Sequence, residues 1–300
     1  MNYQKYFPHF KKQMVNVGDV NISAMVSGSG EEAVLLLHGY PQSGVMWHKI
    51  ANELAKDYRV VISDLRGYGE SDKPRGLADH SNYSKKVMAR DQAILMEKLG
   101  FSKYHLAGHD RGARVCHRFV RDFPDRVKSC VVMDILPTID MYQQTDMLFA
   151  TMYWHWFFLI QPVGFPEQFL ESHPAYFVKM ALMRDADTNG NDIFPEEILN
   201  EYILRFSDPA MIHASCEDYR ASATIDLGHD EEDAGKKTDV PLLALWADAG
   251  VVGLIWDVLA EWRKWAVDVD GFEVESGHFI PEEKPDVVLN AMKNFFNKHK

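Results

Sequence analysis

LAGHDRGARV (106–115) has the pattern of a tight turn between a buried strand and a helix. Two glycines, Gly108 and Gly112, flank a charged residue, Asp110, and Arg111 follows it directly. Turns of this strand–turn–helix type raise one side chain above the carboxyl edge of a parallel sheet. The pattern therefore predicts an α/β fold with Asp110 at the end of a strand.

The segments around this turn support the same fold. Four short apolar runs end at polar turn residues, at 33–39, 58–65, 104–110 and 127–135. Their continuous apolarity is typical of strands that are buried on both faces. Helical patterns lie between them, and the alternation predicts a parallel sheet with helices on both faces. An antiparallel hairpin is expected over 11–29.

The pattern changes after Asp134. Residues 137–239 show helical and aromatic stretches without a buried-strand run. The alternation then resumes, with a strand expected at 240–247, a helix near 254–266, a strand at 272–278 and a helix near 285–298. We therefore expect a core of residues 1–136 and 240–300 and a helical insertion over 137–239, called the cap below.

Composition limits the class of protein. The chain has 300 residues, of which 46% are hydrophobic and 25% charged, as in an ordinary globular protein. Its three cysteines, Cys116, Cys130 and Cys216, suggest reduced thiols and a cytoplasmic location. The most apolar stretch, WFFLIQPVGF, is too short to cross a membrane. A formal charge of −12 disfavours nucleic acid as a partner and means that an anionic substrate needs local cations.

Three polar residues, Asp110, Asp134 and His278, lie at expected strand ends in the order nucleophile, acid, base. Strand ends of a parallel sheet meet at one edge, where ligands bind. Asp248 is the alternative acid, because it follows the strand that often carries this residue. The acid of that usual pattern falls at Gly250, so we prefer Asp134.

An aspartate nucleophile indicates a particular chemistry. A carboxylate is ionised at neutral pH and suits attack on a saturated carbon with a leaving group, or on an epoxide. The product would be an ester of Asp110, which water activated by His278 would hydrolyse. The backbone N–H groups of Arg111 and of Tyr40, in HGYP (38–41), are the expected donors to the oxyanion. We interpret His109 as a packed turn residue.

Two arginines and an aromatic segment suggest the substrate. Arg111 and Arg114 are three residues apart, so both lie on one helix face and would bind a carboxylate. The alternative for Arg114 is a solvent-facing side chain. In the cap, His155 and Trp156 carry N–H donors that would hold a departing halide, and Tyr219 would add a third donor.

These features together resemble the fluoroacetate (haloacetate) dehalogenases of the α/β-hydrolase superfamily over essentially the whole chain. The matching segments are LLHGYPQ, DLRGYGESDKP, AGHDRGARV, VMDILPT, YWHW, CEDYRA and ESGHFIPEE. HDRG is the most specific, because haloalkane dehalogenases and epoxide hydrolases usually have Trp after the nucleophile.

The resemblance implies a mostly parallel eight-stranded sheet with an inserted helical cap. It also implies that a small anionic haloacid, such as fluoroacetate or chloroacetate, is converted to glycolate and halide without cofactor or metal. Asp110 would be the nucleophile, with His278 as base and Asp134 as its partner. The same resemblance implies carboxylate binding by Arg111 and Arg114, halide binding by His155, Trp156 and Tyr219, and a homodimer.

The sequence departs from this family in two places. Tyr40 replaces the usual Phe, which leaves its backbone amide unchanged. The cap stretch 181–194 lacks a Trp found in family members near 180–190, so the preferred halogen and substrate size are open. Within it, residues 185–196 also fit a calcium-loop template at Asp185, Asp187, Asn189, Gly190 and Glu196. A solvated acidic loop is the simpler interpretation.

Two alternative functions remain at this point. An epoxide hydrolase would share the Asp nucleophile and would use cap tyrosines, such as Tyr153 or Tyr219, as acids. A non-catalytic receptor of the same fold would retain the constellation and bind a small acid without turnover.

Overall fold

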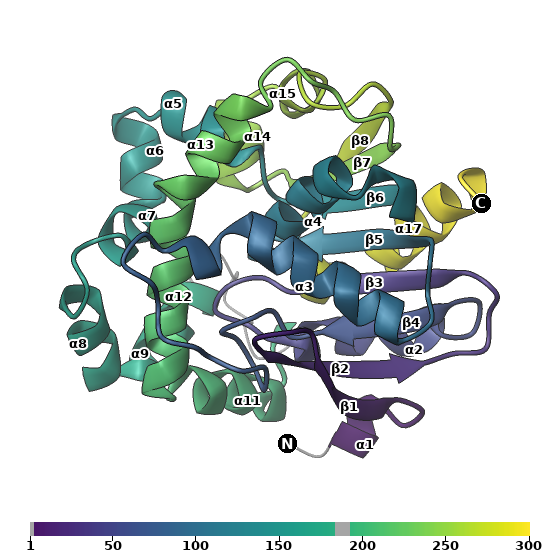
Figure 1. Ribbon diagram of the computed structural model, residues 1–300, viewed down its shortest axis with the longest axis horizontal. Coiled ribbons are helices and arrows are strands. Elements are labelled where there is room, and N and C mark those ends of the chain that lie inside the picture. The colour runs from purple at the N-terminus through teal and green to yellow at the C-terminus, as the bar shows by residue number, and fades with distance from the viewer. Residues whose placement is uncertain (1–2, 184–192) are drawn as a thin grey trace.

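The computed structural model describes residues 3–183 and 193–300 (Figure 1). Its described part contains an eight-stranded sheet in the order β1-β2-β4-β3-β5-β6-β7-β8. The strands are β1 (Lys11–Asn16), β2 (Asn21–Ser27), β3 (Ala33–Leu37), β4 (Arg59–Ser63), β5 (Tyr104–His109), β6 (Val127–Met133), β7 (Leu242–Ala247) and β8 (Val269–Val274). The predicted mostly parallel sheet is confirmed, since among the described strands only β1–β2 and β2–β4 pair antiparallel.

The central strands have the burial that their composition predicts. Every residue of β3 and β5 is buried, as expected for apolar strands covered on both faces. The register pairs His109 of β5 with Met133 of β6, and Met133 with Leu245 of β7. Asp110 directly follows β5 and Asp134 directly follows β6, so these two residues leave the sheet side by side.

Helices cover both faces of this sheet. In Figure 1, α3 (Lys85–Lys98) and α4 (Arg111–Asp122) lie in front of the strands, and α2 (Ala51–Leu54) and α17 (Pro285–Lys298) lie behind them. The remaining core helices are short: α1 (Tyr3–Tyr6), α14 (Val251–Ile255), α15 (Val258–Trp262), α16 (Ile280–Glu283) and the 3-10 turns η1 (Gly44–Lys49), η2 (Ser81–Tyr83) and η3 (Pro124–Arg126).

The cap range 137–239 holds helices and, where the structure describes it, no strand of the sheet. Its helices are α5 (Thr138–Gln143), α6 (Met147–Met152), α7 (Trp154–Leu159), α8 (Phe165–Ser172), α9 (Pro174–Met183), α11 (Glu196–Phe206), α12 (Pro209–Ser222) and α13 (Ile225–Glu232). Figure 1 places them together at the left, beyond the ends of the strands. The division into core and cap remains a proposal.

Two expected elements differ in the structure. The helix expected near 254–266 is divided into α14 and α15, because Trp256 is extended and Asp257 caps a new helix through the N–H of Ala260, at 3.0 Å. The strand expected at 272–278 runs from Val269 to Val274 instead. The N–H groups that follow it donate to side chains rather than to β7, as described below.

Candidate active site

Asp110 lies on a sharp turn between β5 and α4. Its φ is +44° and its ψ −116°, a conformation that costs energy for a residue with a side chain. A Cβ at Gly108 would lie 2.7 Å from Gly112 O, and one at Gly112 would lie 2.6 Å from Leu37 O. The two glycines that flank this turn are therefore required by the close approach of three backbone segments. The N–H of Tyr40 donates to Asp110 Oδ2 over 2.9 Å.

His278 pairs with Asp134. The distance from His278 Nδ1 to Asp134 Oδ2 is 2.6 Å, and the other Asp134 oxygen accepts the N–H of Ala247 at 3.0 Å. Asp248 is exposed, and its Oδ1 accepts the N–H of Ser276 at 3.0 Å. A Cβ at Gly250 would lie 3.3 Å from Asp134 Oδ1. Positions 134 and 250, the two possible places for the acid, are thus adjacent in space. In this protein Asp134 is the residue that contacts His278.

The electrostatics favour an ionised Asp110. Burial raises the pKa of this carboxyl, but its electrostatic interactions with His278, His109, Arg111 and Arg114 outweigh that effect and leave the pKa below its ordinary value. The carboxylate is therefore available as a nucleophile throughout the neutral range.

His109 is buried, and burial lowers its pKa to about 4. The neutral ring donates from Nε2 to the backbone carbonyl of His278, at 2.7 Å. This contact was not predicted from the sequence. The available signal was position alone, since His109 directly precedes Asp110 at the sheet edge where His278 was also expected.

Arg111 is fully buried and attached to the cap. Its Nε donates to Asp218 Oδ2 at 2.9 Å and its Nη2 to Asp218 Oδ1 at 2.7 Å. The guanidinium also lies over the ring of Tyr219, 4.1 Å from the centroid. Burial opposes its charge, but Asp218 holds the pKa of Arg111 well above its usual value. Among the described residues Nη1 alone has no partner on this side chain.

Arg114 is buried as well, which excludes the solvent-facing alternative. Its Nη1 donates to the carbonyl of Leu136 and to the hydroxyl of Thr138, both at 2.9 Å. Its Nε has no partner in the described part of the chain, and none of the bonds there goes to a carboxylate. Burial lowers the pKa of Arg114. Burying a cation without a carboxylate partner carries a desolvation penalty, and an anionic ligand would supply the missing counter-charge.

The residues predicted to hold a halide gather around Tyr219. His155 lies 6.0 Å and Trp156 6.4 Å from the Tyr219 ring, measured between centroids. Trp156 is buried, and its Nε1 donor has no partner within the described residues. The Arg114 guanidinium covers the Trp156 ring at 4.6 Å. The predicted carboxylate and halide residues therefore form one continuous cluster.

A cavity of about 300 Å³ opens onto this cluster. It is lined by Tyr40, Asp110, Tyr153, Trp154, His155, Tyr176, Phe177, Met180, Ala181, Tyr219, His278 and Phe279. The predicted nucleophile, the predicted base and two of the predicted halide residues thus share one mostly aromatic chamber. Arg111 and Trp156 lie against the Tyr219 ring, just outside this lining.

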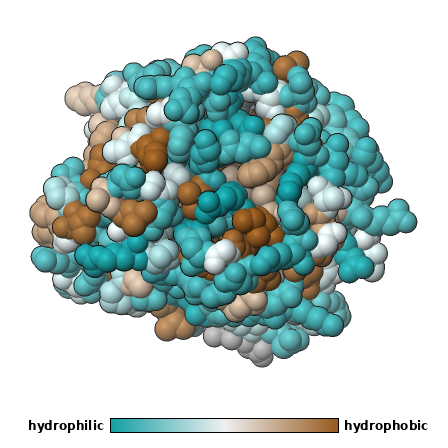
Figure 2. Space-filling view, in the orientation of Figure 1, coloured by the Kyte–Doolittle hydropathy of each residue, from teal (hydrophilic) through white to brown (hydrophobic). Residues whose placement is uncertain are grey.

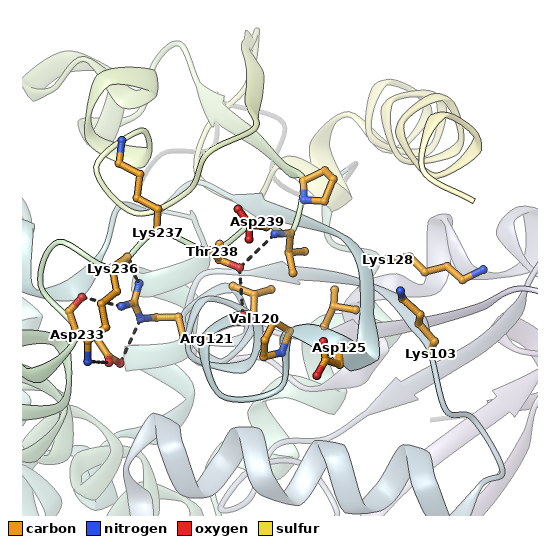
Figure 3. Close-up of a pocket in the computed structure, with 14 residues that line it drawn as sticks. Lys103, Val120, Arg121, Asp125, Lys128, Asp233, Lys236, Lys237, Thr238 and Asp239 are labelled. Atoms are coloured by element: carbon orange, nitrogen blue, oxygen red, sulfur yellow. Dashed lines mark hydrogen bonds and ion pairs between the residues drawn. The ribbon is translucent and has the colours of Figure 1, made fainter.

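A larger hollow, of about 480 Å³, lies at the amino ends of β6 and β7 (Figure 3). It is rich in lysine, but its groups are already occupied or face outward. Arg121 is bonded to Asp233, and the Thr238 hydroxyl donates to the carbonyl of Val120 at 3.2 Å. Figure 3 shows Lys237 extending away from them and Lys103 and Lys128 at the other end. The chamber at Asp110 is therefore the candidate active site.

Two features of the sequence lie largely outside the described residues. These are the acidic segment considered for calcium, most of which falls within 184–192, and the cap stretch without Trp. Across residues 3–183 and 193–300 there is no group of three or more His, Cys, Asp or Glu side chains placed to hold a metal. The same residues include no helix long and apolar enough to cross a membrane.

Comparisons with known proteins identify the family of this fold. Residues 32–285 match the family model described as alpha/beta hydrolase fold. A fluoroacetate dehalogenase of Burkholderia sp is 43% identical over 97% of this chain and 95% of its own length. A soluble epoxide hydrolase of Corynebacterium sp. (strain C12) is 31% identical over 91% and 92%. A solved structure of an alpha/beta hydrolase from Nostoc sp PCC 7120 superposes with a TM-score of 0.94 at 49% identity, covering 97% of this chain and 99% of that one.

Proposed function

Because this chain belongs to the alpha/beta hydrolase family, we propose that it hydrolyses the carbon–halogen bond of short 2-haloacids such as fluoroacetate and chloroacetate. One observation carries the proposal: the ionised Asp110 lines the chamber, and Arg114, a buried cation that none of the described carboxylates bonds, lies one helical turn after it on α4. A substrate with its own carboxylate next to the reactive carbon would pair with Arg114 through that carboxylate and present the carbon to Asp110. The similarity to the Burkholderia fluoroacetate dehalogenase supports the same substrate class.

The first step is displacement at the α-carbon. The substrate carboxylate binds at Arg114 and at the unpartnered Nη1 of Arg111. An oxygen of Asp110 attacks the carbon from the side opposite the halogen, a C–O bond forms, and the halide leaves. His155, Trp156 and Tyr219 are the donors proposed to hold it. Burial raises the pKa of Tyr219 well above its usual value, so its hydroxyl keeps its proton.

The second step is hydrolysis of the Asp110 ester. His278 takes a proton from water, which attacks the carbonyl carbon of the ester. The N–H groups of Tyr40 and Arg111 stabilise the oxyanion, whose collapse breaks the bond between the carbonyl carbon and the alkoxy oxygen. His278 returns its proton to that oxygen, so glycolate departs, and the Asp110 carboxyl loses its proton to solvent. Asp134 orients the ring of His278 through the 2.6 Å bond and stabilises its charge. No cofactor or metal enters either step.

The test is release of halide and glycolate from fluoroacetate and chloroacetate, with Asp110→Ala as the inactive control. Turnover of both by the parent protein, and of neither by the variant, is the expected result. Turnover of chloroacetate alone would keep the displacement chemistry and remove the fluoride assignment. No turnover of either by folded protein would overturn the proposal.

Epoxide hydrolysis is the second candidate. Tyr153 and Tyr219 line the same chamber as Asp110 and would protonate an opening epoxide. The similarity to the Corynebacterium epoxide hydrolase favours it, whereas the buried arginines disfavour a neutral substrate. Diol formation from styrene oxide together with failure on chloroacetate would select this function. Saturable binding of a small acid with neither activity would select the receptor alternative.

We also propose a cytoplasmic homodimer. The cysteines are free and buried, which agrees with a reducing compartment. Figure 2 shows apolar side chains gathered at the left, over the cap helices. Exposed examples are Met147, Trp154, Phe165, Phe169 and Tyr176. Sedimentation of a monomer at micromolar concentration would contradict the dimer.

A further inference from the structure

The segment that carries His278 is held by side chains rather than by the sheet. Strand β8 ends at Val274 and α16 begins at Ile280. Between them, the N–H of Ser276 donates to Asp248 Oδ1 at 3.0 Å. His278 itself follows this turn, so its position depends on contacts outside the ladder of backbone hydrogen bonds.

Glu283 makes the most extensive of these contacts. Its Oε2 accepts the N–H of Gly277 at 2.7 Å, and its Oε1 accepts the N–H of Phe279 at 2.9 Å. One carboxylate therefore holds the backbone on both sides of His278. Gly277 and Phe279 are buried, so water cannot readily replace the acceptor if the carboxylate is removed.

The opposite side of His278 is fixed independently. The carbonyl of His278 accepts from His109 Nε2 at 2.7 Å, and its ring is bonded to Asp134. Because Glu283 also accepts the N–H groups of the two flanking residues, both the backbone and the ring of His278 are held by hydrogen bonds. Small displacements of such a group are expensive in catalysis, because about 1 Å of misplacement can cost on the order of 100-fold in rate.

We propose that Glu283 is a positioning residue that sets His278 for hydrolysis of the ester intermediate. The proposal rests on the function proposed above for its kinetic consequence. Displacement by Asp110 needs no base, whereas attack of water on the ester does. Loss of Glu283 should therefore slow the second step and spare the first.

The test compares Glu283→Ala and Glu283→Gln with the parent protein. The Gln variant keeps one oxygen acceptor and places an NH₂ group against the other N–H, so its effect should be intermediate. Glu275→Gln is the matched control, since Glu275 is exposed on the same segment and three residues from His278. His278→Ala marks complete loss of the second step.

Rapid mixing with chloroacetate gives the kinetic result. We expect Glu283→Ala to release one halide per site at nearly the parent rate and then turn over on the order of 100-fold more slowly. Mass spectrometry should show the carboxymethyl ester accumulating, as in His278→Ala. Equal slowing of both steps, or unchanged turnover, would overturn the proposal.

Proton NMR supplies a result that does not depend on the substrate. The proton between His278 Nδ1 and Asp134 should give a downfield resonance in the parent protein and in Glu275→Gln. It should broaden or disappear in Glu283→Ala at a temperature where circular dichroism shows the variant folded. If chloroacetate gives no ester even with the parent, the proposed function fails, and this resonance alone decides the role of Glu283: its persistence in Glu283→Ala overturns that role.

Discussion

The backbone N–H of Tyr40 donates to Asp110 Oδ2 over 2.9 Å, so the amide expected to stabilise the oxyanion also holds the carboxylate that we propose as the nucleophile. The two roles are compatible, because the Asp110 oxygen that becomes the oxyanion is one of the carboxylate oxygens present at rest. In the proposed mechanism, the position of the Tyr40 backbone is therefore critical for both chemical steps, whereas the Tyr40 side chain matters less.

Gly39 tests the importance of this approach. A Cβ there would lie 2.8 Å from both Asp110 Cβ and His109 Nδ1. Gly39→Ala should therefore push the Tyr40 amide away from Asp110 and lower kcat/KM on the order of 100-fold, with a smaller effect on KM. Tyr40→Phe is the control, since it keeps the amide, and it should remain within about threefold of the parent. Steady-state kinetics on chloroacetate checks both, and equal losses would contradict the argument.

Arg114 should show opposite effects on stability and on substrate binding. Its charge is buried without a bond to any described carboxylate, so replacing it with an apolar side chain of similar length removes a desolvation penalty. We expect Arg114→Met to retain or raise the free energy of unfolding by about 1 kcal/mol and to raise KM at least about 100-fold. Urea unfolding and steady-state kinetics measure the two quantities. A marked loss of stability would show that Arg114 is structural.

Substitution of Asp218, in contrast to that of Arg114, should lower the stability of the protein. Its carboxylate accepts from Arg111 at 2.7 Å, from Tyr68 at 2.7 Å and also from Lys85. Asp218→Asn leaves the buried Arg111 without its counter-charge and Lys85 with only the more distant Asp226, at 3.9 Å, which costs about 3–5 kcal/mol. Urea denaturation should show this loss, and Asp208→Asn, at an exposed cap position, should lose far less. A stable Asp218→Asn protein would indicate that Arg111 and Lys85 find other partners.

The backbone of the site was predictable from the sequence, and the network around it was not. Glycine spacing placed Asp110 at a strand end, and apolar runs placed Asp134 at the end of the neighbouring strand. Both inferences use local patterns that the sheet register then brings together. The identification of Asp134 rather than Asp248 as the partner of His278 was argued from the residue at position 250.

Other features depend on contacts between distant segments. Asp218 meets Arg111 across 107 residues, and no local pattern marks that pairing. The acceptor role of Glu283 was equally hidden, because a glutamate in a short acidic helix is usually solvated. The strand that precedes His278 was expected to begin three residues and to end four residues too far along, since side-chain acceptors for backbone N–H groups are invisible in a hydropathy pattern.

Glu282, in the helix that follows His278, contacts Tyr202 of the cap and should make the stability of the protein depend on pH. It is fully buried, accepts from the hydroxyl of Tyr202 at 2.9 Å and is bonded to Gln42 Nε2. Burial raises the pKa of Glu282 to about 8, from 4.5 in the absence of such an environment. Between these values the folded protein keeps a proton that the unfolded chain releases. The contribution of Glu282 is therefore complete below about pH 4.5 and is lost as the pH rises through about 8.

Glu282→Gln should remove this dependence. The Gln amide matches the neutral acid in shape, and Gln42 Oε1, which has no partner in the described part of the chain, accepts its NH₂ group if the Gln42 amide rotates. We expect the variant to gain stability relative to the parent as the pH rises from 5 to 8, by about 3 kcal/mol at the upper end. Thermal unfolding followed at several pH values measures the difference, with Glu273→Gln, at an exposed position, as the control. Parallel curves for Glu282→Gln and the parent would show that this carboxyl is already ionised in the folded protein.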